Sequence, residues 1–171
     1  MIYLKIDPFY IFSMIIVGLC LIYIVFISVI FPNIKKSKIK KLLLLSASNN
    51  NKKIIIINDK TNGNTFKIKI EGKVYNAKLV FVNKNCDLQV NNFETWVIYK
   101  KCSDGNYKTK TIPDMTRFMQ SKVENKIILL SSKAKTIKKV INECEMIMAN
   151  PSTNVFGVNV FNYNDYDELF K

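Results

Sequence analysis

The chain has 171 residues, enough for one modest domain. It carries 26 Lys plus Arg against 13 Asp plus Glu, a formal net charge of +13, and 49% of its residues are hydrophobic, so it is not a disordered chain. The absence of histidine excludes Ser-His-Asp and Cys-His catalytic arrangements and histidine-based zinc sites. Only five glycines are present and no phosphate-binding glycine loop can be read. The composition therefore argues against an enzyme.

The clearest feature near the beginning of the chain is an uncharged apolar stretch, Phe9–Phe31. At about 1.5 Å per residue, a helix over it is roughly 34 Å long, enough to cross a hydrocarbon core of about 30 Å. A cleaved signal peptide has a shorter apolar region, a basic start and a small-residue cleavage site, whereas here only Lys5 precedes and Pro32-Asn33-Ile34 follows. We therefore expect residues 1–34 to form a retained, single-pass membrane anchor.

A basic cluster follows the anchor and consists of Lys35, Lys36, Lys38, Lys40 and Lys41. The positive-inside rule places such a cluster on the cytosolic side, where it can also bind anionic lipid headgroups. We expect residues 35–51 to form a basic stem that ends in a linker, Ser46–Asn51.

Residues 52–171 predict an α+β domain with a mainly antiparallel sheet. Alternating or continuous apolar runs predict strands at Ile54–Ile57, Thr65–Ile70, Lys73–Val82, Leu88–Val90, Trp96–Lys100, Tyr107–Ile112, Lys126–Ser132 and Val155–Tyr163. Glu71-Gly72 and Asp104-Gly105 mark turns between them. A short helix over Asp114–Ser121 is expected to begin after Pro113.

A second helix is predicted at Ala134–Met148, and Asn150-Pro151 is expected to end it. Its apolar residues recur three and four apart and are Ile137, Val140, Ile141, Cys144, Ile147 and Met148. Lys138 and Lys139 are expected on its solvated face. The last third of the domain is therefore predicted to be a strand-helix-strand unit.

Two cysteines, Cys86 and Cys102, bracket a predicted hairpin. If Val90 faces Thr95, Cys86 lies across from Tyr99 and near Cys102, so a disulfide is conceivable; it would contribute about 3 kcal/mol. The alternative is two free thiols in a reducing compartment. The cysteine spacing does not match a zinc site, and we expect neither a metal nor another cofactor.

One short pattern is typical of metal-dependent nucleases. Pro113-Asp114 followed by Glu124-Asn125-Lys126 resembles the PD-(D/E)xK signature, in which two carboxylates hold magnesium and the lysine stabilises the transferred phosphate. However, Asp114 lies at the start of a predicted helix and Glu124 lies just before a predicted strand. The context therefore disfavours this hypothesis, and no catalytic residue is assigned.

The layout of the chain is similar to that of a viral family. The apolar stretch Phe9–Phe31, the lysines at 35–41 and the segment Trp96–Asp114 resemble the 19-kDa envelope protein family of baculoviruses and nudiviruses, a per os infectivity factor. The resemblance implies a virion envelope protein that sorts through the host inner nuclear membrane. It also implies a non-enzymatic subunit of a complex needed for oral infection and for bringing the virus into host cells.

Three classes of function follow from this reading. The first is docking to other membrane-anchored envelope subunits at the lipid bilayer, with no small-molecule substrate. The second is a membrane-tethered domain that binds nucleic acid or anionic lipid, although Arg117 is the only arginine and phosphate-binding proteins usually keep more. The third is the metal-dependent nuclease.

Overall fold

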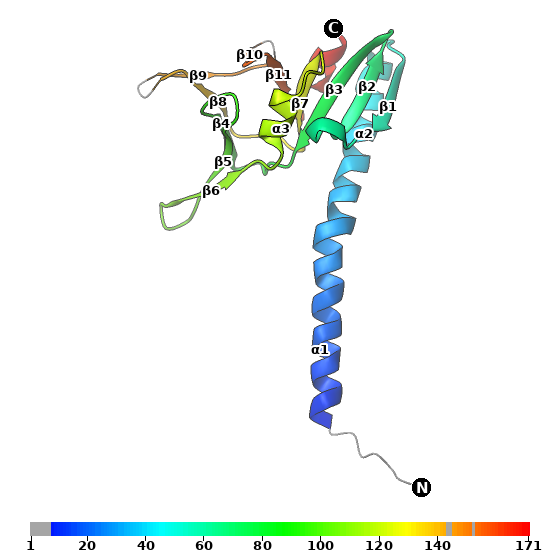
Figure 1. Ribbon diagram of the computed structural model, residues 1–171, viewed down its shortest axis with the longest axis vertical. Coiled ribbons are helices and arrows are strands. Elements are labelled where there is room, and N and C mark those ends of the chain that lie inside the picture. Colours follow the sequence, from blue (N-terminus) through cyan, green and yellow to red (C-terminus); the bar gives the residue numbers. More distant parts are fainter. Residues whose placement is uncertain (1–7, 143–144, 152) are drawn as a thin grey trace. The chain divides into compact units, whose positions relative to one another are not determined.

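The computed structural model describes residues 8–142, 145–151 and 153–171, and the chain divides into a unit that ends at Lys38 and a unit from Ile39 to Lys171. An apolar N-terminal helix precedes two mainly antiparallel sheets with short helices (Figure 1). The predicted α+β class is therefore confirmed.

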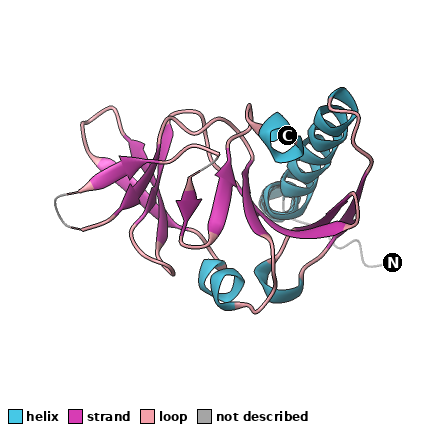
Figure 2. Cartoon of the chain, turned by 90° about the horizontal axis from the view of Figure 1, so that it is seen from above, coloured by secondary structure: helices cyan, strands magenta, loops and turns pink. Residues whose placement is uncertain are grey.

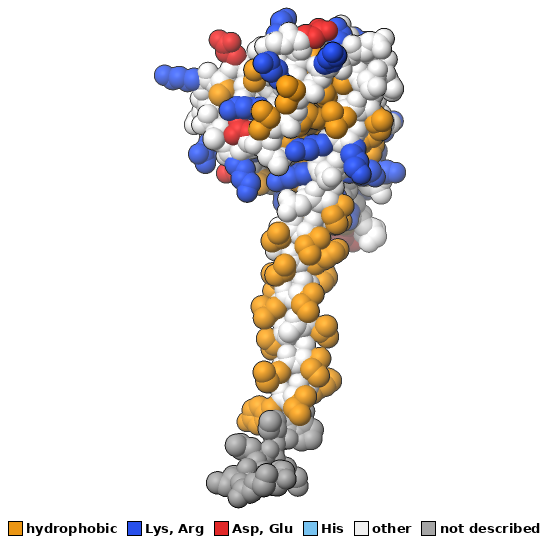
Figure 3. Space-filling model, turned by 90° about the vertical axis from the view of Figure 1, so that its right-hand side faces the viewer, with side chains coloured by type: hydrophobic (Ala, Val, Ile, Leu, Met, Phe, Trp, Pro, Cys, Tyr) orange, Lys and Arg blue, Asp and Glu red, His pale blue; other side chains and the backbone are white. Residues whose placement is uncertain are grey.

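The first unit is helical. It contains α1 (Pro8–Val25), a π-helical turn η1 (Phe26–Ile30) and the beginning of α2 (Phe31–Asn49). An 18-residue window of this helix has a mean hydropathy of 3.0, and none of it is buried. Figure 3 shows hydrophobic side chains along the face of the helix that it presents. Within the described part of the chain, this is the one helix that is long and apolar enough to cross a membrane.

The π-helical turn ends two residues before Pro32, which has no backbone N–H and would leave an unpaired carbonyl in a regular α-helix. In η1 the N–H of Phe31 donates to the carbonyl of Phe26, five residues earlier. The Ser28 hydroxyl donates to the carbonyl of Ile24 at 2.5 Å. Proline is tolerated inside a helix where such local adjustments re-pair the backbone, so the helix continues through Pro32.

The second unit begins within α2. Ile39, Leu43 and Ala47 recur at helical spacing, and all three are buried in the domain core. The segment Ser46–Asn51 was expected to be a linker, but the helix extends to Asn49 and buries Ala47. The domain therefore includes residues that the sequence assigned to the stem, because they cover an apolar face of a sheet.

The strands of the domain form two sheets (Figure 1). Sheet A has the order β1-β2-β3-β7-β11-β10, and sheet B has the order β6-β5-β4-β8-β9. Neighbouring strands are antiparallel except for β3 with β7, β7 with β11, and β4 with β8, which are parallel. The strand bounds are β1 (Ile54–Asn58), β2 (Phe66–Ile70), β3 (Lys73–Val80), β4 (Cys86–Val90), β5 (Trp96–Lys101), β6 (Tyr107–Thr111), β7 (Lys126–Leu130), β8 (Ile137–Val140), β9 (Met146–Met148), β10 (Asn154–Val155) and β11 (Val158–Phe161).

Sheet A is covered on both faces by helical segments, which Figure 2 shows on opposite sides of its strands. On one face, α2 and η3 (Tyr166–Phe170) pack against residues that include Phe66, Ile68 and Leu129. On the other face, α3 (Met115–Gln120) joins a core shared with sheet B, to which Trp96 and Phe118 contribute fully buried side chains. The short turn η2 (Thr61–Gly63) lies against α3. The domain therefore has two cores, one on each face of sheet A.

The predicted helix at Ala134–Met148 is wrong. The segment instead forms β8 and β9, which pair antiparallel with Lys138 opposite Met148. Within the former stripe Ile137 is buried, but Ile141 is 50% exposed and Met148 is 64% exposed; Cys144 lies outside the described residues. The segment contains β-branched residues, which favour strands: Thr136, Ile137, Val140 and Ile141. In addition, β8 pairs with β4, a contact between distant parts of the chain that a local sequence pattern cannot predict. Within the described residues, the parallel strands β7 and β11 are thus connected through strands and not through a helix.

Candidate functional site

The residues of the nuclease-like pattern have separate structural contacts. The Lys126 ammonium donates to the carbonyls of Met119 and Ser121, at 2.6 and 2.5 Å, and so caps the C-terminal end of α3. Burial lowers the pKa of Lys126. The Glu124 backbone carbonyl accepts a hydrogen bond from the Asn76 side chain at 2.8 Å. Within the described residues, no group of three or more acidic, cysteine or histidine side chains is placed to hold a metal ion.

Asp114, the first carboxylate of the pattern, precedes α3 with a positive φ of 55°. It lies near Lys78, a buried lysine whose ammonium donates to the Gly63 carbonyl at 3.1 Å. Burial lowers the pKa of Lys78, and the charge of Asp114 opposes that change. The Lys78 and Lys126 ammonium groups each lie 6.0 Å from the Phe118 ring centroid, within the range of cation–π contacts. Both lysines therefore contribute to anchoring α3 on sheet A.

A buried polar network holds the connection between β1 and β2, and sequence reasoning missed it. The Asp59 carboxylate accepts hydrogen bonds from the Thr61 N–H at 2.9 Å, from the Thr61 hydroxyl at 2.7 Å and from the Asn64 amide at 3.0 Å. The Lys67 ammonium lies 3.2 Å from the same carboxylate. Burial by itself would raise the pKa of Asp59, but these donors outweigh it and hold the pKa well below its ordinary value.

The network continues to the middle of sheet A. The Asn64 amide also reaches the Asn76 side-chain carbonyl at 3.4 Å, and the Asn76 N–H donates to the Asn125 carbonyl at 3.0 Å. Asn64 Oδ1 is buried without a hydrogen-bond partner among the described atoms. The Lys67 ammonium already neutralises the Asp59 carboxylate. The network therefore stabilises the connection between β1 and β2 and is not arranged to bind a cation. An Asp followed two residues later by Thr is the signal that could have revealed its first turn.

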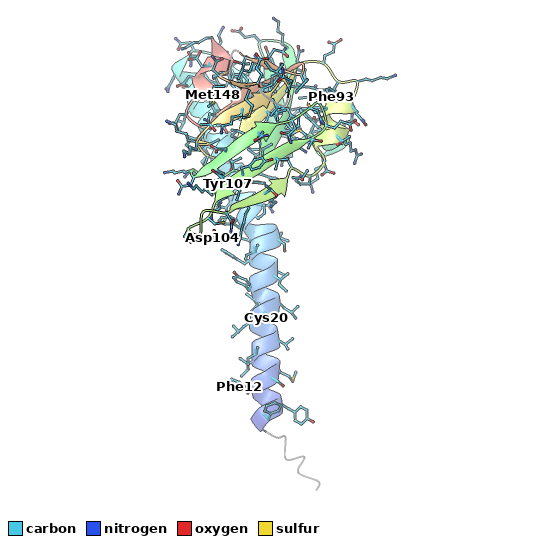
Figure 4. All side chains as sticks on the ribbon, turned by 90° about the vertical axis from the view of Figure 1, so that its left-hand side faces the viewer. Phe12, Cys20, Phe93, Asp104, Tyr107 and Met148 are labelled. Carbon is cyan, nitrogen blue, oxygen red and sulfur yellow. The ribbon has the colours of Figure 1, made fainter. Side chains whose placement is uncertain are left out.

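Two strands at the ends of the sheets, β1 and β9, carry exposed apolar side chains. On β1, Ile55 and Ile57 are 58% and 57% exposed, while Ile54 and Ile56 pack against the core below. Figure 3 views the side on which β1 lies in Figure 1, and it shows hydrophobic side chains gathered between lysines. On β9, Met146 and Met148 project from the surface, and Figure 4 labels Met148 there. Exposed apolar side chains grouped on strand edges mark candidate sites of protein contact.

Lysines form the other notable surface. On the β5–β6 ribbon, Lys100 is the direct cross-strand partner of Lys108, and Lys110 lies on the same face two residues further along. All three are exposed. Like charges directly opposite one another destabilise a sheet, so this pair favours an anionic neighbour. Lys139, predicted on a solvated helix face, instead lies 4.9 Å from the Phe156 ring centroid, and Lys138 lies 3.9 Å from the Asp87 carboxylate.

Of the two alternatives left open for Cys86 and Cys102, the structure has the second, since both are free thiols. The register differs by one residue from the expectation: Val90 faces Trp96, and Cys86 faces Lys100. Cys86 is buried, whereas Cys102 lies beyond the end of β5, where its N–H donates to Asn106 and closes the turn. Cys20 is exposed on α1 (Figure 4).

The basic cluster that follows the apolar stretch lies on α2. Lys35 places its ammonium 4.5 Å from the Phe31 ring centroid. In the second unit, Lys40 lies 5.6 Å from the ring centroid of Phe66. The other members of the cluster are Lys36, Lys38 and Lys41, and they lie on the same helix.

The candidate site is therefore the exposed apolar side chains of β1 and β9. No protein-family model, no curated protein and no solved structure matches this chain.

Proposed function

We propose that this protein is a membrane-anchored, non-enzymatic subunit of an envelope complex, and that its domain acts by docking other anchored proteins. The observation that carries the proposal is the exposure of large apolar side chains on β1 and β9, which lie at the ends of their sheets. Burying such side chains against a partner gains roughly 25 cal/mol for each Å² removed from water.

The helix over residues 9–31 supplies the anchor of this proposal. It is uncharged, long enough to cross a bilayer and followed by lysines that suit an anionic headgroup region. Confinement to one surface raises the effective concentration of neighbouring subunits, so modest contacts can hold a complex together. The viral envelope and oral-infectivity role rests on the sequence resemblance, and it supplies a setting in which several anchored proteins act together.

The proposal is tested on the full chain in its native membrane. Carbonate extraction should leave the protein in the pellet, and intact mass should include the residues before Pro32. After solubilisation in a mild detergent, native gels and cross-linking should find it with other membrane-anchored proteins. A protein that migrates alone, in detergents that preserve other membrane complexes, would contradict docking; release by carbonate would contradict the anchor.

A second candidate is binding of anionic lipid or nucleic acid through the β5–β6 ribbon, favoured by the facing lysines Lys100 and Lys108. Phosphate contacts of this kind weaken steeply with salt. Binding to phosphatidylserine vesicles or to duplex DNA that falls with salt, and falls further in Lys108→Glu/Lys110→Glu, would favour this candidate over docking.

A further inference from the structure

The backbone of β1 presents one hydrogen-bonding edge to solvent, and its register identifies which groups lie there. Glu71 and Gly72, with φ of 46° and 88°, form a two-residue hairpin loop, so Ile70 and Lys73 are a hydrogen-bonded pair. Along an antiparallel pair, hydrogen-bonded and non-hydrogen-bonded residue pairs alternate. The backbone groups of Lys67 and Lys69 therefore point away from β3 and toward β1. Their partners Ile57 and Ile55 therefore bond to β2.

The other residues of β1 direct their backbone groups to the opposite side of the strand. The backbone N–H and C=O groups of Ile54, Ile56 and Asn58 point away from β2. The hydrogen bond from the Asp59 N–H to the Thr65 carbonyl, at 3.1 Å, agrees with this alternation, because Asp59 follows Ile55 and Ile57 at intervals of two residues. In sheet A β1 is an end strand with β2 as its neighbour, so within the described residues no other strand pairs with this edge.

Unlike the other strands at the ends of the sheets, β1 has no feature that prevents a further strand from pairing with it. Natural sheets block their edges with lysines, prolines or very short strands. β6 carries Lys108 and Lys110, β10 has two residues and β9 has three. β1 has five residues, Ile-Ile-Ile-Ile-Asn, with no charge and no proline. It therefore offers the longest unprotected edge in the described part of the domain.

The side chains of β1 are apolar except for Asn58; charged residues lie at the two ends of the strand and on β2, where Lys69 and Lys67 are opposite Ile55 and Ile57. Ile55 and Ile57 are exposed on one face, so an added strand could cover them with its own apolar side chains. Lys53 and Lys60 flank β1, both exposed, and neither forms an ion pair within the described residues. Pairing with a second copy of β1 would bring these lysines together in either strand direction, which disfavours self-association.

We infer that β1 accepts an extended segment of another protein as an added strand, and that this segment has a short apolar core with an acidic residue at each end. Backbone hydrogen bonds to Ile54, Ile56 and Asn58 supply its alignment, Ile55 and Ile57 supply the apolar contact, and Lys53 and Lys60 select the acidic ends. This inference rests on the proposed docking function, for which it names the surface and the chemistry of the partner.

The test uses the full chain in detergent micelles and two synthetic peptides. One has six alternating valine and threonine residues between two glutamates, to match the six residues between Lys53 and Lys60, and the other has lysines in place of the glutamates. The glutamate peptide should bind about tenfold more tightly, a difference of about 1.4 kcal/mol, because it forms two exposed ion pairs where the lysine peptide meets like charges. Residue-resolved hydrogen exchange should find the amides of Ile54, Ile56 and Asn58 protected by that peptide, with Ile55 and Ile57 unchanged.

Two variants and a matched control test the surface itself. Lys53→Glu/Lys60→Glu should weaken the glutamate peptide about tenfold and favour the lysine peptide. Asn58→Pro removes an outward N–H without removing a bond to β2, because Asn58 and Phe66 are a non-hydrogen-bonded pair; it should weaken both peptides at least threefold. Lys108→Glu/Lys110→Glu makes the same charge change on β6 and should leave peptide affinity within twofold. Circular dichroism should verify that each variant is folded.

The outcomes separate this inference from the docking proposal. Equal affinity for the two peptides, protection at β6 or β9 instead of β1, or protection of β1 that depends on protein concentration without peptide would each overturn the inference. If the solubilised complex persists unchanged in Lys53→Glu/Lys60→Glu and Asn58→Pro, docking stands and β1 is not its surface. If wild-type protein forms no complex at all, the docking proposal itself fails.

Discussion

Replacing Asp59 by Asn tests the buried network that pins the β1–β2 connection. Asp59 is 9% exposed and accepts bonds from the Thr61 N–H, the Thr61 hydroxyl and the Asn64 amide, with Lys67 beside it. Asparagine keeps one acceptor oxygen but turns an NH₂ group toward the Asn64 amide or Lys67, so donors face donors. A buried unsatisfied group costs about 1–3 kcal/mol, and charge-assisted bonds are also lost. We expect Asp59→Asn to reduce the free energy of unfolding by about 2–4 kcal/mol.

The same carboxylate gives the stability a pH dependence of defined sign. Its folded-state pKa is lower than that of the unfolded chain, near 4, so its contribution is fully present above that value. The contribution is lost as the pH falls through the folded-state pKa, because protonation removes the charge that the donors stabilise. The difference in stability between wild type and Asp59→Asn should therefore be constant from pH 7 to about pH 5 and shrink below pH 4.

Urea unfolding of the full chain in detergent, followed by the fluorescence of Trp96, measures both effects. Trp96 is the only tryptophan and is fully buried. Asp104→Asn is the matched control, since Asp104 accepts two bonds from Asn106 in an exposed turn and its replacement should cost less than about 0.5 kcal/mol. Equal unfolding midpoints for the two variants at pH 7, or a wild-type difference that stays constant to pH 3, would refute the reasoning.

The remaining predictions use the same unfolding measurement. Gly63→Ala should destabilise by about 2–4 kcal/mol, because a Cβ would lie 2.8 Å from the Asp114 carbonyl oxygen at a φ of 74°; Gly72→Ala, at a φ of 88° with nothing within 4 Å, should cost only about 1–2 kcal/mol. Equal losses would mean that the contact with α3 is unimportant. Leu43→Ala should cost about 2–5 kcal/mol, whereas Leu45→Ala, 59% exposed, should stay within about 0.5 kcal/mol. Ile141→Asp should leave the domain folded, since Ile141 is half exposed; unfolding would restore the buried helix predicted there.

Local patterns were sufficient for several elements of this protein. The hairpin from Phe66 to Val80 depends on alternating apolar residues and a two-residue turn at Glu71-Gly72, and both are visible in the sequence. The register of the next hairpin was missed by one residue, because its connection at Asn91–Thr95 is longer and fixes the pairing less tightly. Sequence reasoning therefore predicted where strands occur better than how they pair.

The candidate site depended more on tertiary contacts. Asp114, Glu124 and Lys126 form a suggestive sequence pattern, but their surroundings give Lys126 the role of capping α3 and place Asp114 near Lys78. The position of β1 at the end of sheet A could not be predicted from the sequence either. An isoleucine run predicts a buried strand, and whether a strand lies inside a sheet or at its end depends on residues far along the chain.

The sequence by itself determined the long apolar helix near the N-terminus and the strand-rich character of the domain, because these depend on composition and on the period of nearby residues. Tertiary structure alone decided that Ile137–Val140 is a strand and that Ile39, Leu43 and Ala47 belong to the core. A segment with both helical spacing and β-branched residues can form either a helix or a strand at similar free energy. The partner that it finds selects one of them: β4 pairs with Ile137–Val140, and the apolar face of sheet A holds the end of α2.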